Sequence, residues 1–306
     1  MNRRPTRALP RSTASTPATV RFRARAFGRA LLIGALLAIP ARAPAETAVL
    51  EAVADAEMRQ FNPFIILGSN PTIATGTTGT MGGGEIRRSI FKFDPAAQIP
   101  PGSIVTEATV TLECTLVPIM NRVDDYFELR RLLRNWVETN VTWQTPWQSG
   151  GAAGAEDVVS DVSSSVFIAD LGAYSFPSTS NLVADVQAWV SDPGTNFGWT
   201  LRSAVEGSQY SARLFASRES TGPPRPRLTI TFVPPPQITN LQAANGVFQF
   251  LFAAESNRAY TVEHRAALDS GSWLLLTNFP ASSTTLTQSV TDALDTTNRF
   301  YRVRSP

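Results

Sequence analysis

The aromatic side chains offer the most evident binding chemistry in this sequence. Half of its six tryptophans fall within RNWVETNVTWQTPW at 134–147, as Trp136, Trp143 and Trp147. An indole ring can stack on the face of a sugar, but a cluster of this kind also packs a β-rich core. The spacing alone leaves both interpretations open, a carbohydrate platform and a structural anchor.

Arginine is the second resource for binding. Residues 46–306 contain 17 arginines and a single lysine, Lys92. The planar guanidinium group binds carboxylates through two parallel hydrogen bonds and stacks on aromatic rings. The alternative is that these arginines pair with acidic residues of the chain itself. Those in the larger of the two domains expected below include Arg87, Arg88, Arg130, Arg131, Arg134, Arg202, Arg213 and Arg218.

The sequence offers little for catalysis. The only histidine is His264, near the C-terminal end, where we expect a surface or rim residue. A Ser-His-Asp triad or a His/Cys zinc site in the larger domain is therefore excluded. A glycosidase needs only two carboxylates, and the spacing along a chain does not give their separation in space. We expect no catalytic residues and no enzyme, although carboxylates are available at Glu128, Glu138, Asp157, Asp161, Asp170 and Asp185.

No cofactor is expected, but a structural calcium ion stays open as an alternative. Calcium takes oxygen ligands in flexible geometry, and the acidic sites at Asp124-Asp125 and from Glu156-Asp157 to Asp161 could supply them. The single cysteine, Cys114, excludes an intrachain disulfide. It alternates in step with Val110, Leu112 and Leu116, which predicts a core position on a strand.

The N-terminal segment has the composition of a targeting signal. Residues 1–45 contain nine arginines, no acidic residue, and the short apolar run ALLIGALLAIPA at 30–41. Twelve apolar residues are too few to span a bilayer, which needs about 20. With the small residues before Glu46, the pattern predicts a secretory signal peptide cleaved after Ala45, and an organellar transit peptide is the alternative. We therefore expect a secreted, extracellular or cell-surface protein without a membrane span in the mature chain.

Removal of this leader changes the sign of the net charge. The full chain has a net charge of +2, whereas residues 46–306 hold 18 basic and 25 acidic residues, a net charge of −7. A nucleic-acid partner would need a clustered basic face on the mature domain. The sequence therefore gives no support for binding to nucleic acid.

Short alternating runs separated by turn residues predict an all-β protein, a jelly-roll β-sandwich with one short helix. The Gly/Thr-rich stretch 68–86 and the small, polar stretch 149–180 are expected to be long loops. The apolar period of STSNLVADVQAWV at 178–190 predicts a helix that closes one end of the sandwich, capped by Ser180 or Asn181. The expected strands are 47–53, 60–67, 87–93, 104–117, 125–133, 198–204, 212–216 and 226–233.

Three consecutive prolines in VPPPQI predict a stiff linker at 234–238. The preceding domain is expected at 46–233 and a second, smaller one at 239–306. The smaller domain is expected to be an immunoglobulin- or fibronectin-like β-sandwich. Its strand-like runs are VFQFLFAA, AYTVEHR, SWLLL, TTLTQSV and RFYRVR.

Six blocks of the larger domain, taken in order, resemble a known family. They are RSIFKFD at 88–94, IPPGSIVTEATVTLE at 99–113, ELRRLLRNWVETNVTWQTP at 128–146, LVADVQAWV at 182–190, NFGWTLR at 196–202 and FASRESTGPPRPRLTITF at 215–232. Together they are similar to the DNRLRE domain, also described as carbohydrate-binding module family 96, over about residues 47–233. The name-giving hexapeptide itself is absent, and the insertion at 149–180 is longer than usual.

The resemblance implies a non-catalytic jelly-roll module that binds polysaccharide, with uronic-acid polymers such as alginate among the family's ligands. Because the block at 134–146 recurs in the family, Trp136 and Trp143 are assigned to packing, while Trp147 stays a candidate platform. The C-terminal domain resembles the small C-terminal β-domains of secreted planctomycete and verrucomicrobial proteins. The candidate ligand-binding residues are Arg130, Arg218, Trp147 and Tyr210.

Three functions stay open at this stage. The first is a secreted polysaccharide-binding or cell-surface module, with other cell-surface proteins as additional partners. The second is a structural protein of a matrix or envelope that binds protein partners only. The third is a polysaccharide lyase or hydrolase.

Overall fold

A computed structural model describes residues 45–293 and 298–305 of the chain. These residues divide into two compact units, with the boundary between Pro235 and Pro236. The predicted signal peptide at 1–45 lies outside the described residues, apart from Ala45. No helix in the described part of the chain is both long enough and apolar enough to cross a membrane.

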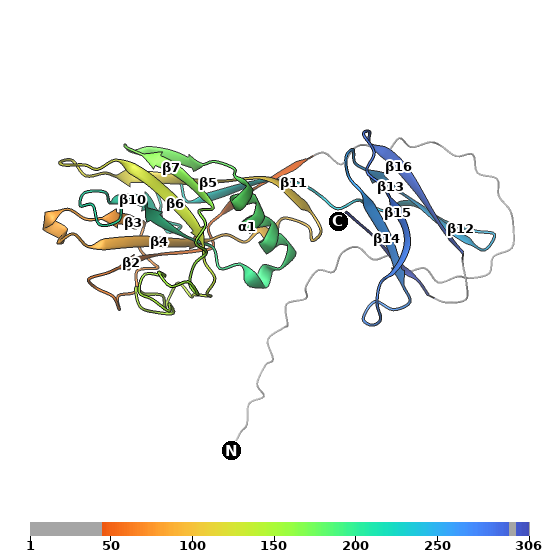
Figure 1. The fold of residues 1–306 in the computed structure, drawn as a ribbon, viewed down its shortest axis with the longest axis horizontal. Coiled ribbons are helices and arrows are strands. Elements are labelled where there is room, and N and C mark those ends of the chain that lie inside the picture. Colours follow the sequence, from red (N-terminus) through yellow and green to blue (C-terminus); the bar gives the residue numbers. More distant parts are fainter. Residues whose placement is uncertain (1–44, 294–297, 306) are drawn as a thin grey trace, which may run out of the picture. The chain divides into compact units, whose positions relative to one another are not determined.

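The larger unit is built from antiparallel strands and one α-helix (Figure 1). Its strands are β1 (Glu46–Glu51), β2 (Ala54–Arg59), β3 (Thr72–Thr77), β4 (Ile86–Lys92), β5 (Ile104–Leu116), β6 (Asp125–Arg131), β7 (Ser164–Ile168), β8 (Gly172–Phe176), β9 (Trp199–Ser203), β10 (Arg213–Ala216) and β11 (Arg227–Val233). Its helix is α1 (Ser180–Ser191), and short 3₁₀ turns are η1 (Thr80–Gly82), η2 (Pro95–Ala97) and η3 (Pro193–Thr195).

These strands form two layers, joined where β3 changes partners. One layer contains β1, β11, β5, β10 and β8, and the other contains β2, β4, β9, β6 and β7. The first part of β3 pairs with β10, whereas Gly76 and Thr77 pair with β4. Gly76 has a φ of 110°, and a Cβ there would approach the Cα of Ala212 to 2.7 Å. Glycine therefore allows β3 to pass from one layer to the other at this point.

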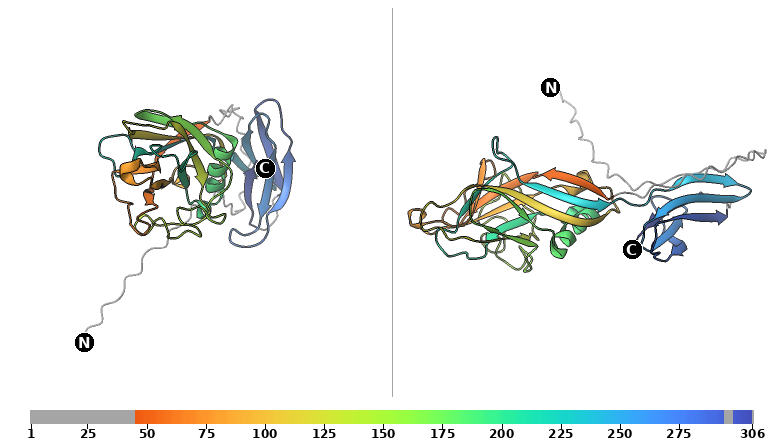
Figure 2. Two further views of the ribbon diagram at one scale, coloured as in Figure 1. Left: turned by 60° about the vertical axis from the view of Figure 1, so that its left-hand side comes forward. Right: turned by 90° about the horizontal axis from the view of Figure 1, so that it is seen from above.

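The main core lies between the two layers. Alternate residues of β5, such as Val110, Leu112 and Cys114, are buried and face aromatic side chains of the second layer. Among these, Phe91 and Trp199 have ring centroids 6.4 Å apart. Figure 2 shows the strands of this unit from two further sides. The structure confirms the predicted all-β sandwich and the predicted core position of Cys114.

Helix α1 lies at one end of this sandwich, as predicted (Figure 1). Its apolar stripe, with Leu182, Val186 and Trp189, is buried in the main core, and the Trp189 and Trp199 ring centroids are 4.4 Å apart. The predicted cap was wrong by one residue. The Thr179 hydroxyl, not Ser180 or Asn181, accepts the hydrogen bond from the Leu182 N–H at 3.1 Å.

One expected strand of the larger unit was wrong, and four observed strands were not predicted. Residues 60–67 form turns and irregular structure, while the expected loops at 68–86 and 149–180 contain β3, β7 and β8. Strand β2 was also missed. Apolar and polar residues alternate in its sequence ADAEMR, but the acidic residues Asp55 and Glu57 are buried as well as Ala56 and Met58.

The smaller unit is a sandwich of two three-stranded sheets. Their order is β12-β13-β16 and β15-β14-β17. Each sheet therefore combines strands from the first and second halves of the unit, as in immunoglobulin- and fibronectin-like sandwiches. Phe250, Phe252 and Val262 are buried between the sheets. The strands are β12 (Thr239–Ala244), β13 (Val247–Ala254), β14 (Tyr260–Arg265), β15 (Leu274–Phe279), β16 (Leu286–Ala293) and β17 (Phe300–Arg304).

Candidate functional site

Residues 134–147, which we call the tryptophan segment, form part of a second, smaller core of the larger unit. Trp136, Trp143 and Trp147 are all buried, and they pack with Ile90 of β4 and Met58 of β2. On β4, Ile90 alternates with Phe91 of the main core, so this second core lies on the outer face of the sheet. The assignment of Trp136 and Trp143 to packing is therefore confirmed.

The expectation that Trp147 is an exposed platform was wrong. Its side chain is only 7% exposed, and the indole N–H donates to the Thr142 carbonyl oxygen at 3.0 Å. The Thr142 hydroxyl in turn accepts hydrogen bonds from the backbone N–H groups of Gln144 and Thr145. These local bonds turn the chain after Thr142 and direct the Trp147 ring back into the second core.

Asp157 organises the segment that follows the tryptophans. Its fully buried carboxylate accepts hydrogen bonds from the backbone N–H groups of Gln148 at 2.7 Å and of Ser149 and Gly154 at 3.0 Å. The Arg134 Nε is 3.1 Å away. Burial alone would raise the pKa of Asp157, but these donors and the Arg134 charge together lower it. The carboxylate therefore fixes the 148–157 loop.

Three arginines lie side by side on the outer face next to this loop, and we call them the arginine row. Ser89 of β4 pairs with Leu201 of β9, so Arg88 lies opposite Arg202. On the other side of β9, Arg202 pairs with Glu128 of β6. Paired residues on adjacent strands share a face, about 4.8 Å apart in strand spacing. Arg130 lies two residues further along β6, where it pairs with Thr200, and is therefore a diagonal neighbour of Arg202 on the same face. The row consists of Arg88, Arg202 and Arg130.

The two outer members of the arginine row have carboxylate partners. Arg88 donates from Nε and Nη2 to the two carboxylate oxygens of Glu206, at 2.8 and 2.6 Å. Arg130 donates from Nε and Nη2 to Glu128 Oε2, at 3.1 and 2.8 Å. These ion pairs account for two of the three positive charges in the row, which leaves a local charge of one.

Arg202, in the middle of the row, differs from its two neighbours because no carboxylate in the described part of the chain pairs with it. Within the described part of the chain it donates to the Ala152 carbonyl oxygen, has no carboxylate partner, and leaves its buried Nε without a hydrogen bond. Burial, followed by the nearby charge of Arg88, lowers the pKa of Arg202 to about 10. A half-buried guanidinium between two other arginines would be stabilised by an anion.

An exposed aromatic pair lies on the same face of β6 and β7. Tyr126 precedes Glu128 and Arg130 by two and four positions, so the three side chains point to one side of β6. Phe167 pairs with Tyr126 across the strands, and their ring centroids are 5.3 Å apart. Tyr126 is 54% exposed and Phe167 is 46% exposed. Exposed aromatic side chains next to charged groups are typical of a binding surface.

The structure does not bring the four predicted ligand-binding residues together. Arg130 belongs to the arginine row, but Arg218 follows β10 and donates its backbone N–H to Asp55 of β2. Strands β9 and β4 separate β6 from β2, a spacing of about 14 Å across the sheet. The expectation that Arg130 and Arg218 share one binding face was therefore wrong.

Tyr210 is held within a loop contact. It has a φ of 65°, and its hydroxyl is 2.8 Å from the Thr80 hydroxyl in η1. Its ring covers Gly79, where a Cβ would lie 2.2 Å from a ring carbon. The half-buried Tyr210 thus joins two loops instead of presenting a free ring. Sequence analysis missed three residues of the candidate face, Tyr126, Phe167 and Arg202. Only the register of the strands, which the sequence does not reveal, places them on one face.

Several of the carboxylates that sequence analysis offered for catalysis or calcium have internal partners. Asp185 lies on the buried side of α1 and accepts from the Ser163 hydroxyl and the Trp199 indole N–H, at 2.6 and 2.9 Å. Asp124 pairs with Arg213, and Asp125 accepts from the Ser203 hydroxyl and the Val205 N–H. Together with the bonds of Asp157, these contacts give Asp124, Asp125, Asp157 and Asp185 a structural role.

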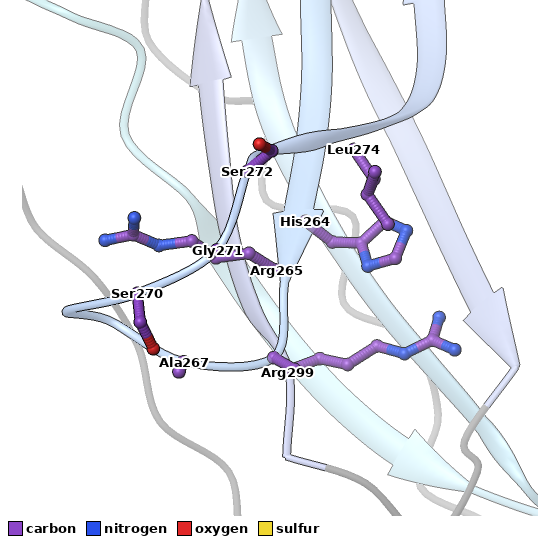
Figure 3. A pocket seen from close by; sticks show the side chains of 9 residues that line it. His264, Arg265, Ala267, Ser270, Gly271, Ser272, Leu274 and Arg299 are labelled. Atoms are coloured by element: carbon purple, nitrogen blue, oxygen red, sulfur yellow. The ribbon is translucent and has the colours of Figure 1, made fainter.

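The smaller unit contains an open pocket of about 380 Å³ (Figure 3). His264 and Arg299 lie on one side of β14 in this view, whereas Arg265 points to the other side. The Arg265 guanidinium carbon is 4.4 Å from the Trp273 ring centroid, and Arg299 pairs with Asp292. The cationic groups around the pocket therefore point away from one another. His264 is a half-buried strand residue on its rim.

Comparison with protein-family models and with curated proteins gave no match to this chain. The class of protein that the fold defines is an all-β protein made of two sandwich units. The candidate binding surface in the larger unit is the outer face of β4, β9, β6 and β7.

Proposed function

We propose that the larger unit is a non-catalytic carbohydrate-binding module that binds an acidic polysaccharide on this outer face, outside the cell or at its surface. The observation that carries the proposal is the half-buried Arg202, which lacks a carboxylate partner among the described residues, on the same sheet face as exposed Tyr126 and Phe167. A uronic-acid carboxylate would accept hydrogen bonds from Arg202, while a sugar ring would stack on the aromatic pair.

The charge distribution is compatible with an anionic ligand. Residues 46–306 have a net charge of −7, which opposes long-range attraction of a polyanion. Exposed charges farther away than about 8 to 10 Å are screened at physiological salt, however. At contact distance the three arginines and two glutamates of the face leave one net positive charge. The resemblance of residues 47–233 to the DNRLRE domain supports the same class of ligand.

Affinity electrophoresis and calorimetry with alginate, pectin and a neutral glucan test this function. We expect the acidic polymers to bind and the neutral glucan to bind more weakly. The Tyr126→Ala and Arg202→Gln variants should each lose about tenfold in affinity, which is about 1.4 kcal/mol. Phe64→Ala is the matched control, because Phe64 is exposed in the turn region between β2 and β3. It should bind like the wild type.

Other results would contradict the proposal in defined ways. Failure to bind any of the polymers, combined with cross-linking of intact cells that captures protein neighbours only, would favour a structural matrix or envelope protein. Release of reducing ends from a polymer would indicate a lyase or hydrolase. Equal affinities of the Tyr126→Ala and Phe64→Ala variants would move the binding site away from this face.

A further inference from the structure

Three carboxylates converge at the edge of the larger sandwich, far along the chain from one another. Asp55 belongs to β2, Glu138 follows Trp136 in the tryptophan segment, and Glu219 follows β10. One carboxylate oxygen from each of them lies within 4.8 Å of the other two. We call these residues the Asp55 cluster. It is distinct from the arginine row, which lies on the outer face of β4, β9 and β6.

Arg218 compensates only part of the negative charge in this cluster. Its Nε is 2.7 Å from Glu138 Oε1 and 2.8 Å from Glu219 Oε1, and its Nη2 is 2.9 Å from Glu138 Oε2. One guanidinium therefore serves two glutamates, and three ionised carboxylates would leave two negative charges. The Arg218 side chain is 37% exposed, so it can turn toward solvent and leave room between the carboxylates.

The third carboxylate is buried and only half satisfied. Asp55 is 1% exposed, and its Oδ2 accepts the Arg218 backbone N–H at 2.7 Å. Its buried Oδ1 has no hydrogen-bond partner among the described residues. A buried carboxylate oxygen without a donor is costly unless a cation or a proton neutralises it.

The geometry suits a hard divalent cation. Calcium binds carboxylate oxygens at about 2.3 to 2.6 Å, so two oxygens on opposite sides of one ion are about 4.8 Å apart. The three carboxylate oxygens of the Asp55 cluster all lie within 4.8 Å of one another, so they can reach one such ion. The donors are oxygen atoms alone, which favours calcium over zinc or copper. Glu138 is also fixed in position, because its carbonyl and Cγ approach Gly68 too closely for any Cβ at that residue.

We propose that Asp55, Glu138 and Glu219 bind one calcium ion, which ties β2, the tryptophan segment and the chain after β10 together at the sandwich edge. The bound ion neutralises the unpartnered Asp55 oxygen and replaces part of the Arg218 interaction with the glutamates. Water molecules complete its coordination on the side where Arg218 and Glu219 are partly exposed. The proposal is independent of carbohydrate binding, because it concerns a different part of the unit.

Calorimetry and thermal unfolding of EDTA-treated protein with calcium chloride test the site. We expect one calcium ion per chain. At a calcium concentration about 100-fold above the dissociation constant, the melting temperature of the larger unit should rise by about 5 to 10 °C. Magnesium chloride at the same concentration should give a smaller rise, because magnesium requires near-octahedral geometry and retains its water. EGTA should reverse the calcium effect.

Two variants and one control keep the outcome decisive. Glu219→Gln lies in a partly exposed position and should fold, yet it should bind calcium at least tenfold more weakly. Asp55→Asn should lose the calcium response and unfold at an unchanged or higher temperature without metal, because charge repulsion is relieved. Glu51→Gln removes an exposed carboxylate paired with Arg225 and should bind like the wild type. Absence of calcium binding to the wild type, or equal binding by Glu219→Gln, would overturn the proposal.

Discussion

Asp157 allows a direct test of what holds the 148–157 loop next to the arginine row. We expect Asp157→Asn to lower the free energy of unfolding of the larger unit by about 3 kcal/mol at pH 7. Hydrogen bonds to a charged group contribute about 1.5 to 3 kcal/mol each, and the four donors share one carboxylate, so their contributions do not simply add. In the variant, the asparagine NH₂ group is itself a donor, so it would face backbone N–H groups without forming a hydrogen bond. For a unit of this size the change lowers the melting temperature by about 6 to 12 °C.

The pH dependence of this variant has a definite sign. The pKa of Asp157 is lowered in the folded protein, so its stabilisation is present above the unfolded value of about 3.9 and is lost as the pH falls through the folded value. Urea unfolding followed by far-UV circular dichroism should therefore show wild type and variant converging below about pH 4.

The matched control for this experiment is Asp161→Asn. Asp161 is an exposed acid close in sequence to Asp157. Its replacement should change the free energy of unfolding by less than about 0.5 kcal/mol. A loss below about 1 kcal/mol for Asp157→Asn at pH 7, or a loss of unchanged size at low pH, would refute the proposed role of the carboxylate.

Three further predictions concern packing. Trp147→Ala should cost about 4 kcal/mol in urea unfolding, because it empties a buried site, while exposed Phe64→Ala should cost almost nothing. Burial raises the pKa of the Cys114 thiol to about 11, so Ellman's reagent should react only as the protein unfolds; rapid reaction of the native protein would contradict this. Gly198→Ala should cost more than about 2 kcal/mol, because φ is 76° and a Cβ would lie 2.1 Å from the Phe91 carbonyl oxygen. An unchanged free energy of unfolding for Gly198→Ala would mean that the backbone around residue 198 moves to accommodate the Cβ.

The sequence predicts those parts of the fold in which burial follows a simple period. β5 alternates between core and solvent and α1 has one apolar stripe, so both are found within one or two residues of their observed limits. In β2 and β3 burial does not alternate, because four consecutive residues of β2 and five of β3 are buried. In β2, inward-facing Glu57 accepts the Ala74 N–H of β3, so an acidic side chain occupies a core-side position.

The candidate site was predictable only in its chemistry. An excess of arginine over lysine indicates binding or pairing of carboxylates, and Arg130 does lie on the proposed face. Residue type does not reveal which guanidinium lacks a partner, because that depends on strands far apart in sequence. Trp147 shows the same limit, because a position after Pro146 is compatible with exposure until the turn at Thr142 is known.

The pairing of β1 with β11 has a consequence for the order in which the larger unit can be completed. β11 lies between β1 and β5, so the first strand of the unit joins the sheet only through the last one. During synthesis, β1 emerges long before its partner and must stay unpaired until residue 233 is available. Contacts of such sequence separation slow folding and leave strand edges open to aggregation in the meantime. We therefore expect the nascent chain to depend on a chaperone until the whole of the larger unit has been synthesised.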